Sequence, residues 1–259
     1  MKFQKKHADL PAGRLQYLCQ GSGRPLLCLH PASGVRITQA SEQLAESFSV
    51  YLPILPGFDE TPLLNSEAGM AELAQLVAEF IEVVIGSRAD VAGHSFGGWV
   101  ASWLAVLRPD LVGRLVLQCP AGFRPEGKAG PETDPVKLLA QAYAHPEKRR
   151  SETKSAEVTA ANRRLFSIYS AGAASDHALI DRLDEIQADT LILRGLKDGV
   201  IPEESAQLLK RLIPRSRLVH VDDAAHNLEV DQPEEYVRLV KDFLAASAKQ
   251  TMPVQGQTR

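Results

Sequence analysis

A serine flanked by glycines is the residue of this chain best suited to chemistry. Ser95 stands in the segment Gly93-His94-Ser95-Phe96-Gly97, between one short apolar run and a second apolar stretch. Glycine two residues before and two residues after a serine is typical of a sharp strand-to-helix turn, where a Cβ at either flank would clash with the backbone. The motif therefore predicts a serine nucleophile held on a sharp turn, which needs a base, an acid and oxyanion donors from elsewhere in the chain.

The base should be one of the seven histidines. His226 follows an expected strand at residues 217–221 by a short loop, so it can reach over the edge of the sheet where the serine emerges. His30 and His220 lie within or at the ends of expected strands, where a hydrogen-bonded core histidine is the ordinary outcome. His94 is next to the serine and should point elsewhere on the turn. We therefore predict that His226 is the general base.

The acid must lie at the same end of a neighbouring strand. Asp198 follows an expected strand at residues 190–194, in a loop that leads into a helix. A helix-capping or turn aspartate is the alternative interpretation at such a place. Asp222 and Asp223 are further alternatives, but so close in sequence to His226 they would have difficulty reaching its far nitrogen. We predict Asp198 as the acid.

Two backbone N–H groups are expected to hold the oxyanion of an acyl-transfer reaction. One belongs to Phe96, directly after the serine at the start of a helix. The other should come from the loop after the strand at residues 25–29. Pro31 has no N–H, so Ala32 is the first possible donor and Ser33 the next. His30 is expected to brace this loop rather than to titrate in catalysis.

Five residues are candidates for the wall of a substrate pocket, because they flank the predicted catalytic segments. They are Ser33, Phe58, Trp99, Val200 and Leu228. No metal or cofactor is implied, since the three cysteines, Cys19, Cys28 and Cys119, fit no metal or redox spacing.

The elements that must position these residues are short apolar runs alternating with amphipathic helical stretches. This pattern predicts an α/β fold with a mostly parallel central sheet of about eight strands and helices on both faces. Expected strands cover residues 14–20, 25–29, 49–54, 89–92, 114–118, 190–194 and 217–221, and expected helices cover residues 70–85, 97–107, 202–212 and 233–246.

One long segment interrupts the alternation. Residues 123–184 contain loops rich in glycine and proline and then polar helices, which predicts a helical cap inserted into a core made of residues 1–122 and 185–246. The segment carries the basic cluster Lys148-Arg149-Arg150, which we interpret as a solvated helix face because acidic residues are interspersed. The polar stretch 247–259 is expected to be disordered.

Composition excludes several classes of partner. The chain has 259 residues and a formal net charge of -3, which gives no electrostatic case for nucleic acid. No apolar run approaches the roughly 20 residues that span a bilayer, so no membrane association is expected. Few and scattered cysteines suggest reduced thiols in the cytoplasm. We expect a small-molecule substrate, and the oligomeric state stays open.

Taken together, these motifs resemble the α/β-hydrolase fold superfamily. The resemblance covers residues 13–246 and rests on the residues that follow the strands, in the order nucleophile, acid, base. They are Leu26-Leu27-Cys28-Leu29-His30, Pro56-Gly57-Phe58, Gly93-His94-Ser95-Phe96-Gly97-Gly98, Gly195-Leu196-Lys197-Asp198 and Ala225-His226. The family usually has His-Gly where this chain has His30-Pro31, a departure that concerns the oxyanion loop.

The resemblance implies a cytoplasmic serine hydrolase that cleaves a small carboxylic ester, thioester or lactone through an acyl-enzyme intermediate. Dehalogenases and epoxide hydrolases of this fold use an aspartate nucleophile, so Ser95 speaks against both. Two alternatives stay open. One is a hydrolase of carbon–carbon bonds or amides with the same triad. The other is a ligand-binding, receptor-like protein with negligible turnover.

Overall fold

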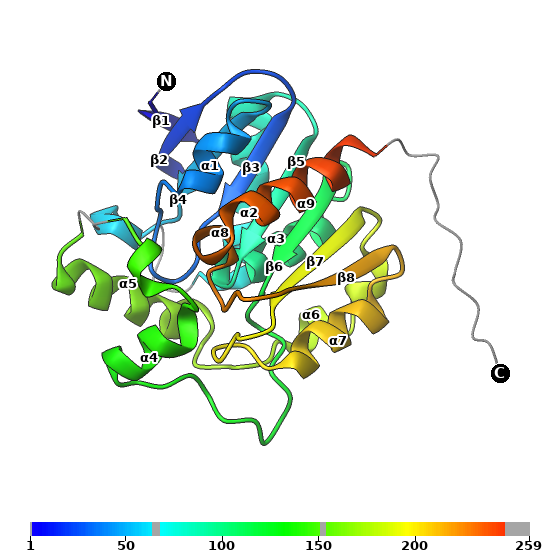
Figure 1. Cartoon of the computed structure of the whole chain (residues 1–259). Coiled ribbons are helices and arrows are strands. Elements are labelled where there is room, and N and C mark those ends of the chain that lie inside the picture. Colours follow the sequence, from blue (N-terminus) through cyan, green and yellow to red (C-terminus); the bar gives the residue numbers. More distant parts are fainter. Residues whose placement is uncertain (1, 64–67, 151–153, 247–259) are drawn as a thin grey trace.

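A computed structural model of the chain describes residues 2–63, 68–150 and 154–246 (Figure 1). The expectation of disorder for residues 247–259 lies outside the described residues.

The centre of the molecule is an eight-stranded sheet with the order β1-β2-β4-β3-β5-β6-β7-β8. β2 pairs antiparallel with β1 and with β4, whereas β4, β3, β5, β6, β7 and β8 are all parallel to one another. This confirms the predicted mostly parallel sheet. The strands are β1 Gln4–Leu10, β2 Gly13–Gln20, β3 Pro25–Leu29, β4 Ser49–Ile54, β5 Ala89–His94, β6 Val112–Gln118, β7 Asp189–Gly195 and β8 Ser216–Val221.

β1 is a strand that the sequence pattern does not predict. Only Ala8 and Leu10 of this strand are buried, and its other residues are exposed. Lysines on an exposed edge strand are common because they discourage pairing with other chains. With two inward-facing residues near its end, the strand carries too little alternation to be recognised.

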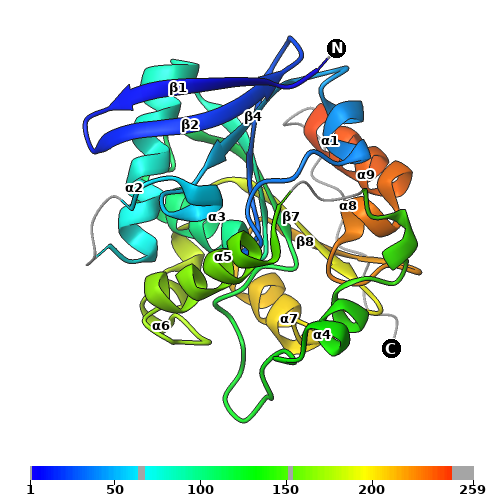
Figure 2. The ribbon, with the colours of Figure 1, turned by 90° about the vertical axis from the view of Figure 1, so that its left-hand side faces the viewer.

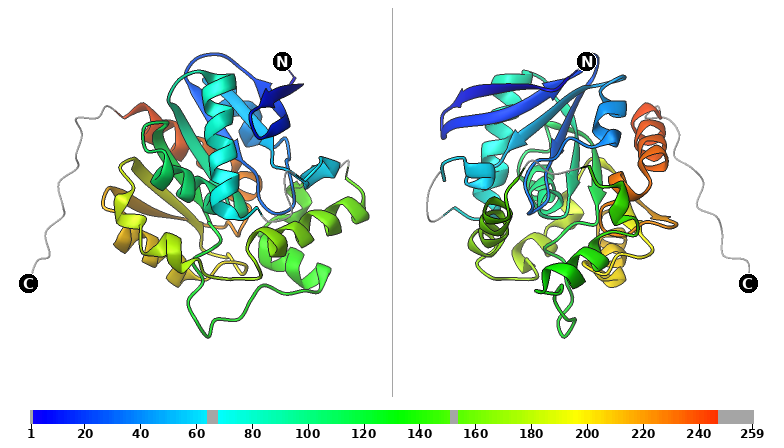
Figure 3. Two further views of the ribbon diagram at one scale, coloured as in Figure 1. Left: turned by 180° about the vertical axis from the view of Figure 1, so that it is seen from behind. Right: turned by 60° about the vertical axis from the view of Figure 1, so that its left-hand side comes forward.

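Helices cover both faces of the sheet. α1, α8 and α9 lie on the face toward the viewer in Figure 1, and α2 and α3 cover the opposite face, seen from behind in Figure 3. The helices are α1 Gln39–Leu44, α2 Met70–Phe80, α3 Phe96–Leu107, α4 Pro135–Ala142, α5 Ala156–Tyr169, α6 His177–Ile180, α7 Glu203–Leu212, α8 Leu228–Asp231 and α9 Pro233–Ala245, with short turns η1 Phe58–Glu60, η2 Ile81–Ile85, η3 Pro146–Lys148 and η4 Leu183–Glu185. Among the described residues, no helix has the length and apolar character to cross a membrane.

The helix that starts after Ser95 is buried along almost its whole length. α3 exposes little because it is apolar nearly all round, which is the pattern of a helix packed between a sheet and other helices. The preceding helix, α2, continues into the π-helical turn η2 and ends at Gly86 with φ 69°. Its end and the buried start of β5 together fix where the chain turns toward Ser95.

Between β6 and β7 the described chain contains helices but adds no strand to the sheet. We call residues 123–184 the insertion. Figure 2 shows its helices α4 and α5 at one end of the sheet, whereas α6 lies near α7 in Figure 1. The hydroxyl of Tyr169 in α5 donates to the carbonyl of Pro56 at 2.8 Å, just beyond β4. The insertion therefore packs against the carboxyl ends of the strands, where ligands bind in open α/β sheets.

Candidate active site

Ser95 occupies a strained turn between β5 and α3. Its backbone has φ 53° and ψ -113°, outside the regions that a serine ordinarily adopts. A Cβ added to Gly97 would lie 2.3 Å from the carbonyl oxygen of Leu29, and one added to Gly93 would lie 2.4 Å from that of Gly97. The predicted need for glycine on both sides of the serine is confirmed.

Asp198 and His226 meet at the carboxyl ends of β7 and β8. The Nδ1 atom of His226 lies 3.1 Å from Oδ2 of Asp198, and the two side chains are 8% and 0% exposed. The other carboxylate oxygen accepts the N–H groups of Val200 at 2.8 Å and Ile201 at 3.0 Å. Asp198 is thus both the turn aspartate of the alternative interpretation and the partner of His226.

Two effects compete over the pKa of Asp198. Burial is the largest and opposes ionisation, but the charge and hydrogen bond of His226, the N–H of Ile201 and the Cys119 thiol favour the carboxylate. The net pKa of Asp198 is lower than usual, so the group is an anion beside the imidazole. A buried carboxylate at Nδ1 orients the ring and leaves Nε2 free for proton transfer.

His94 links this pair to the turn that holds Ser95. Its ring lies 4.8 Å, centroid to centroid, from the ring of His226. Because His94 directly precedes Ser95, His226 lies beside the turn that holds Ser95. Burial, followed by the nearby His226 and Arg36, lowers the pKa of His94 well below its usual value, so His94 is neutral.

The alternative carboxylates lie elsewhere. Asp222 and Asp223 are exposed, and Asp223 pairs with Lys197 at 2.6 Å and with His145 at 2.7 Å. The structure therefore brings Asp198, and neither of these aspartates, to the imidazole of His226.

The loop after β3 is held by hydrogen bonds around His30. Nδ1–H of His30 donates to the carbonyl of Pro31 at 2.8 Å, and the N–H of Leu55 donates to Nε2 at 3.0 Å. Burial lowers the pKa of His30 to about 4, so the ring is neutral and can serve both partners. As expected from the sequence, His30 braces the loop that contains Ala32 and Ser33.

Polar side chains hold Ser33 from three directions. Its carbonyl accepts from Asn162 at 3.0 Å and from Lys154 at 3.3 Å, and both of these residues belong to the insertion. Its hydroxyl accepts from Arg36 at 2.7 Å. The backbone of Ala32 therefore lies between Pro31, which is held by His30, and Ser33, which is held by these contacts. Phe96, the other predicted donor, is the first residue of α3, so its N–H has no acceptor within the helix.

The five predicted pocket residues differ in their surroundings. Phe58, Trp99 and Leu228 are buried, whereas Ser33 and Val200 are partly exposed. The ring of Phe58 lies 4.7 Å from that of His30 and 5.2 Å from that of Phe96. Phe58 thus packs against the loop that follows β3 and against the first turn of α3.

Sequence reasoning missed two polar residues behind His226. Nε2 of Gln118, the last residue of β6, donates to the backbone carbonyl of His226 at 3.2 Å and also contacts the carboxyl group of Glu229. The other carboxyl oxygen of Glu229 lies 3.6 Å from Nδ1 of His94, and burial raises the pKa of Glu229. Neither residue carries a sequence signal, since Glu229 looks like an ordinary first-turn acid of a helix.

Cys119 brings a third possible ligand atom next to the Asp198–His226 pair. One ligand atom from each of the three residues lies within 4.8 Å of the others. Burial, and then the charge of Asp198, raises the pKa of the Cys119 thiol well above its usual value. Metal ligation needs a thiolate, so this set is better suited to a hydrogen bond from the thiol to the carboxylate than to a metal ion.

Comparison with known proteins shows the family of this chain. The sequence pattern described as the alpha/beta hydrolase family matches residues 26–239. The chain belongs to this family of hydrolases. It is similar to 2-hydroxy-6-oxo-2,4-heptadienoate hydrolase of Pseudomonas putida, with 28% identity over 255 residues that cover 87% of this chain and 91% of the relative.

Two further relatives illustrate the range within the family. Pimeloyl-[acyl-carrier protein] methyl ester esterase of Aeromonas salmonicida is 26% identical over 249 residues, covering 86% of this chain and 96% of the relative. The structure of the meta-cleavage product hydrolase of Pseudomonas fluorescens superimposes with a TM-score of 0.76 and 21% identity, covering 92% of this chain and 97% of that one. The last comparison supports the fold.

Proposed function

We propose that this hydrolase uses Ser95 as nucleophile, His226 as general base and Asp198 as the carboxylate that orients the imidazole. The observation that carries the proposal is the buried His226–Asp198 contact of 3.1 Å beside the strained turn of Ser95. In this scheme His226 removes the hydroxyl proton as Ser95 attacks a carbonyl carbon. Asp198 stabilises the resulting imidazolium.

The backbone N–H groups of Phe96 and Ala32 are proposed to hold the oxyanion. Phe96 offers the N–H at the start of α3, where the helix dipole favours negative charge. The support for Ala32 is the bracing of its loop by His30 and the contacts at Ser33. Since Pro31 replaces the glycine common in the family, Ala32 is the earliest residue of this loop after His30 that can donate.

The substrate proposed is a small carboxylic ester, thioester or lactone. Attack by Ser95 on an ester or thioester forms an acyl-enzyme and releases an alcohol or thiol, which takes a proton from the His226 imidazolium. With a lactone the ring opens, and the new hydroxyl, protonated in the same way, stays on the acyl chain. His226 then activates a water that cleaves the acyl-enzyme, releasing the acid and restoring the serine. The similarity to a methyl ester esterase supports this class. The insertion is proposed to act as a cap over the acyl pocket.

Hydrolysis of a carbon–carbon bond beside a ketone is the second candidate. It is favoured by the similarity to the oxo-heptadienoate hydrolase of Pseudomonas putida. The same three side chains would serve this reaction, so substrate assays must separate the two candidates. We further propose that the protein works in the reducing cytoplasm, on the support of its three free cysteine thiols.

Labelling with a fluorophosphonate followed by mass spectrometry tests the nucleophile. We expect the adduct on Ser95 and loss of both labelling and ester hydrolysis in Ser95→Ala. Ser102→Ala is the matched control, because Ser102 is a buried serine of α3 whose hydroxyl donates to the carbonyl of Gly98. A label at another residue, or full ester hydrolysis by Ser95→Ala, would refute the assignment.

A substrate panel then separates the candidate reactions. Short and long p-nitrophenyl esters, a thioester, a lactone and 2-hydroxy-6-oxo-2,4-heptadienoate should be compared by kcat/KM. Preference for the dienoate would favour the second candidate. Tight binding of one of these compounds without turnover would favour a receptor-like protein.

A further inference from the structure

A cavity of about 540 Å³ lies on the side of the molecule where the insertion meets α1 and α8. One part of its wall is made of residues 35–39, at the start of α1, together with residues of α8 and the first residue of α9. The other part is made of residues 148–150 and 154, which precede α5. Among the described residues, the lining is Leu18, Val35, Arg36, Ile37, Thr38, Gln39, Lys148, Arg149, Arg150, Lys154, Glu229, Val230 and Pro233. The volume is within the range of small-molecule sites in proteins, roughly 300–1,000 Å³.

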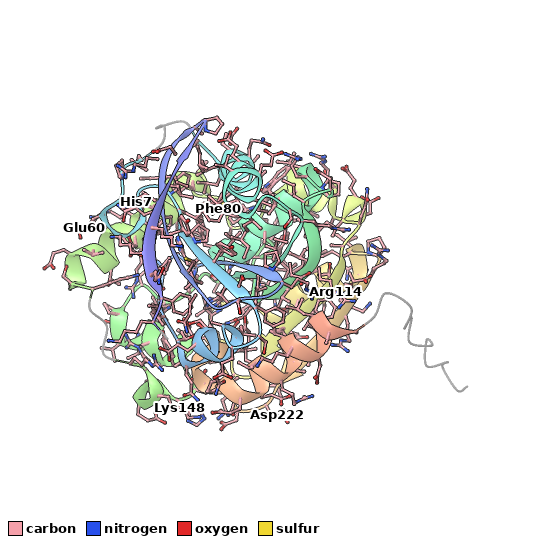
Figure 4. The ribbon with its side chains drawn as sticks, turned by 90° about the horizontal axis from the view of Figure 1, so that it is seen from above. His7, Glu60, Phe80, Arg114, Lys148 and Asp222 are labelled. Carbon is pink, nitrogen blue, oxygen red and sulfur yellow. The ribbon has the colours of Figure 1, made fainter. Side chains whose placement is uncertain are left out.

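The basic cluster of the insertion is part of this wall. The prediction of a solvated helix face for Lys148-Arg149-Arg150 holds in part, since Lys148 and Arg150 are exposed but the three residues do not form one helix. Lys148 ends the short turn η3, the two arginines follow it outside any helix, and all three line the cavity. Figure 4 shows Lys148 at the rim of the molecule.

Positive charge dominates the lining. Among the described residues of the lining, Arg36 and Lys154 join the cluster to give five cationic residues, against one carboxyl group, that of Glu229. Burial raises the pKa of Glu229 against the opposing effect of the nearby Arg36. Such an excess of cations in one cavity attracts anions and is suited to groups with more than one charge.

Contacts within the protein hold these cations in place. Nζ of Lys148 donates to the backbone carbonyl of Asp231 at 2.6 Å, and the guanidinium of Arg149 lies 5.1 Å from the ring centroid of Tyr143. Arg150 pairs with Glu42 at 2.7 Å and Lys154 with Asp59 at 2.8 Å, both carboxylates outside the lining. The planar fork of arginine binds carboxylate and phosphate oxygens in pairs.

This cavity is distinct from the proposed catalytic centre but touches the loops that build it. Ser95, Asp198 and His226 are not among its lining residues. Arg36 connects the two places, since it donates to Ser33 at 2.7 Å and to the side chain of Asn227, the residue after His226, at 3.2 Å.

We propose that this cavity binds a small polyanion, a molecule with at least two phosphate or carboxylate groups. Arg149 and Arg150 bind its charged groups from the insertion side together with Lys148, and Arg36 binds from the core side. The bound anion joins the insertion to the core beside the oxyanion loop.

Isothermal titration calorimetry of the full chain with pyrophosphate and, separately, with citrate tests the proposal. At low ionic strength we expect saturable binding of at least one of the two anions, with an affinity that falls as salt is added. Tighter binding of pyrophosphate identifies phosphate as the preferred group, and tighter binding of citrate identifies carboxylate. Absence of binding by both anions at millimolar concentration overturns the proposal.

Charge-removal variants locate the site. Lys148→Gln and Arg150→Gln change exposed side chains, and each should weaken binding about tenfold, since each removes a charge-assisted hydrogen bond. Lys137→Gln is the matched control, because Lys137 is an exposed cation of α4 that does not line the cavity. Equal weakening by the control, or unchanged affinity in both site variants, would show that the anion binds elsewhere and overturn the assignment.

Discussion

Asp198 meets two requirements with one carboxylate. One oxygen fixes the turn after β7 by accepting the N–H groups of Val200 and Ile201, and the other contacts His226. The guanidinium of Arg194 supports the same turn through the carbonyls of Asp198 and Ile201. Because the turn already fixes the carboxylate, little rearrangement is needed to orient the imidazole.

Replacing Asp198 by asparagine should lower kcat for the best ester substrate by about 10³–10⁴-fold, with KM little changed. The amide oxygen can keep one role of the carboxylate, but a neutral amide does not stabilise the imidazolium. Steady-state kinetics check this, with Asp223→Asn as the control, because Asp223 is the exposed alternative next to His226 in sequence. A larger loss in Asp223→Asn than in Asp198→Asn would contradict the assignment of the acid.

Glu229 should make the stability of the protein depend on pH. Because burial raises its pKa, the folded state keeps the proton to higher pH than the unfolded state does. The stabilisation is present at low pH and is lost as pH rises through the folded-state pKa. Relative to Glu229→Gln, the wild-type free energy of unfolding should therefore fall between about pH 5 and about pH 8.

Urea unfolding of wild type and Glu229→Gln at both pH values measures this difference. The neutral glutamine has no proton to lose, and it retains an oxygen that can accept from Gln118. A difference between the two proteins that is the same at both pH values would contradict the prediction.

The turn at Ser95 depends on the close approach of two elements. The start of α3 lies so near the end of β3 that Gly97 has no room for a side chain. Gly97→Ala should therefore move α3 away from the oxyanion loop and lower kcat/KM for esters by at least about 100-fold. Gly130→Ala is the control, because a Cβ there would meet no atom within 4 Å.

Steady-state kinetics measure the activity of the Gly97→Ala variant, and circular dichroism measures its helix and strand content. We expect lost activity in a protein that still has the helix and strand content of the wild type, or failure to fold. Wild-type activity in Gly97→Ala would mean that the backbone can move apart without cost, contrary to the packing described here.

At the scale of elements, the sequence predicts those helices and strands that have a regular apolar pattern and end at glycine or proline. The buried strand before Ser95 and the helix after it are found as expected, because runs of apolar residues and glycine turns are local signals. The short helices α1 and α8 were not predicted, since six and four residues are too few to show a helical period. Without α8, the position of Glu229 behind His226 could not be foreseen.

Across the whole molecule, one carboxylate ties the insertion to the core. Asp176 accepts the indole N–H groups of Trp99 and Trp103, each at 2.7 Å, and also caps α6 through the N–H of Leu179. Both indoles belong to α3, the helix that starts at Ser95. The contact therefore links the far end of the insertion to the helix beneath the proposed site.

Asp176→Ala should destabilise the protein by about 3 kcal/mol more than Asp134→Ala. Both aspartates cap a helix, but only Asp176 also serves two tryptophans, and a buried donor left without a partner costs about 1–3 kcal/mol. Thermal unfolding followed by circular dichroism should show a midpoint lower by about 5–10 °C than that of Asp134→Ala. Equal midpoints would show that the indoles find other partners.

The candidate site illustrates the same limit of sequence reasoning. Ser95, Asp198 and His226 could be proposed because each follows a strand of one parallel sheet, so topology alone predicts their proximity. The cationic cavity could not, because it joins Arg36 to residues about 110 positions later through packing that no local pattern encodes.

The pairing of both indoles with Asp176 also gives the unmodified protein an optical reporter. The chain contains two tryptophans, and these are the two that share this carboxylate. Emission excited at the indole band therefore arises from a single place, the junction between α3 and the insertion. Ligand entry or movement of the insertion could be followed through that emission in real time, without attaching a dye.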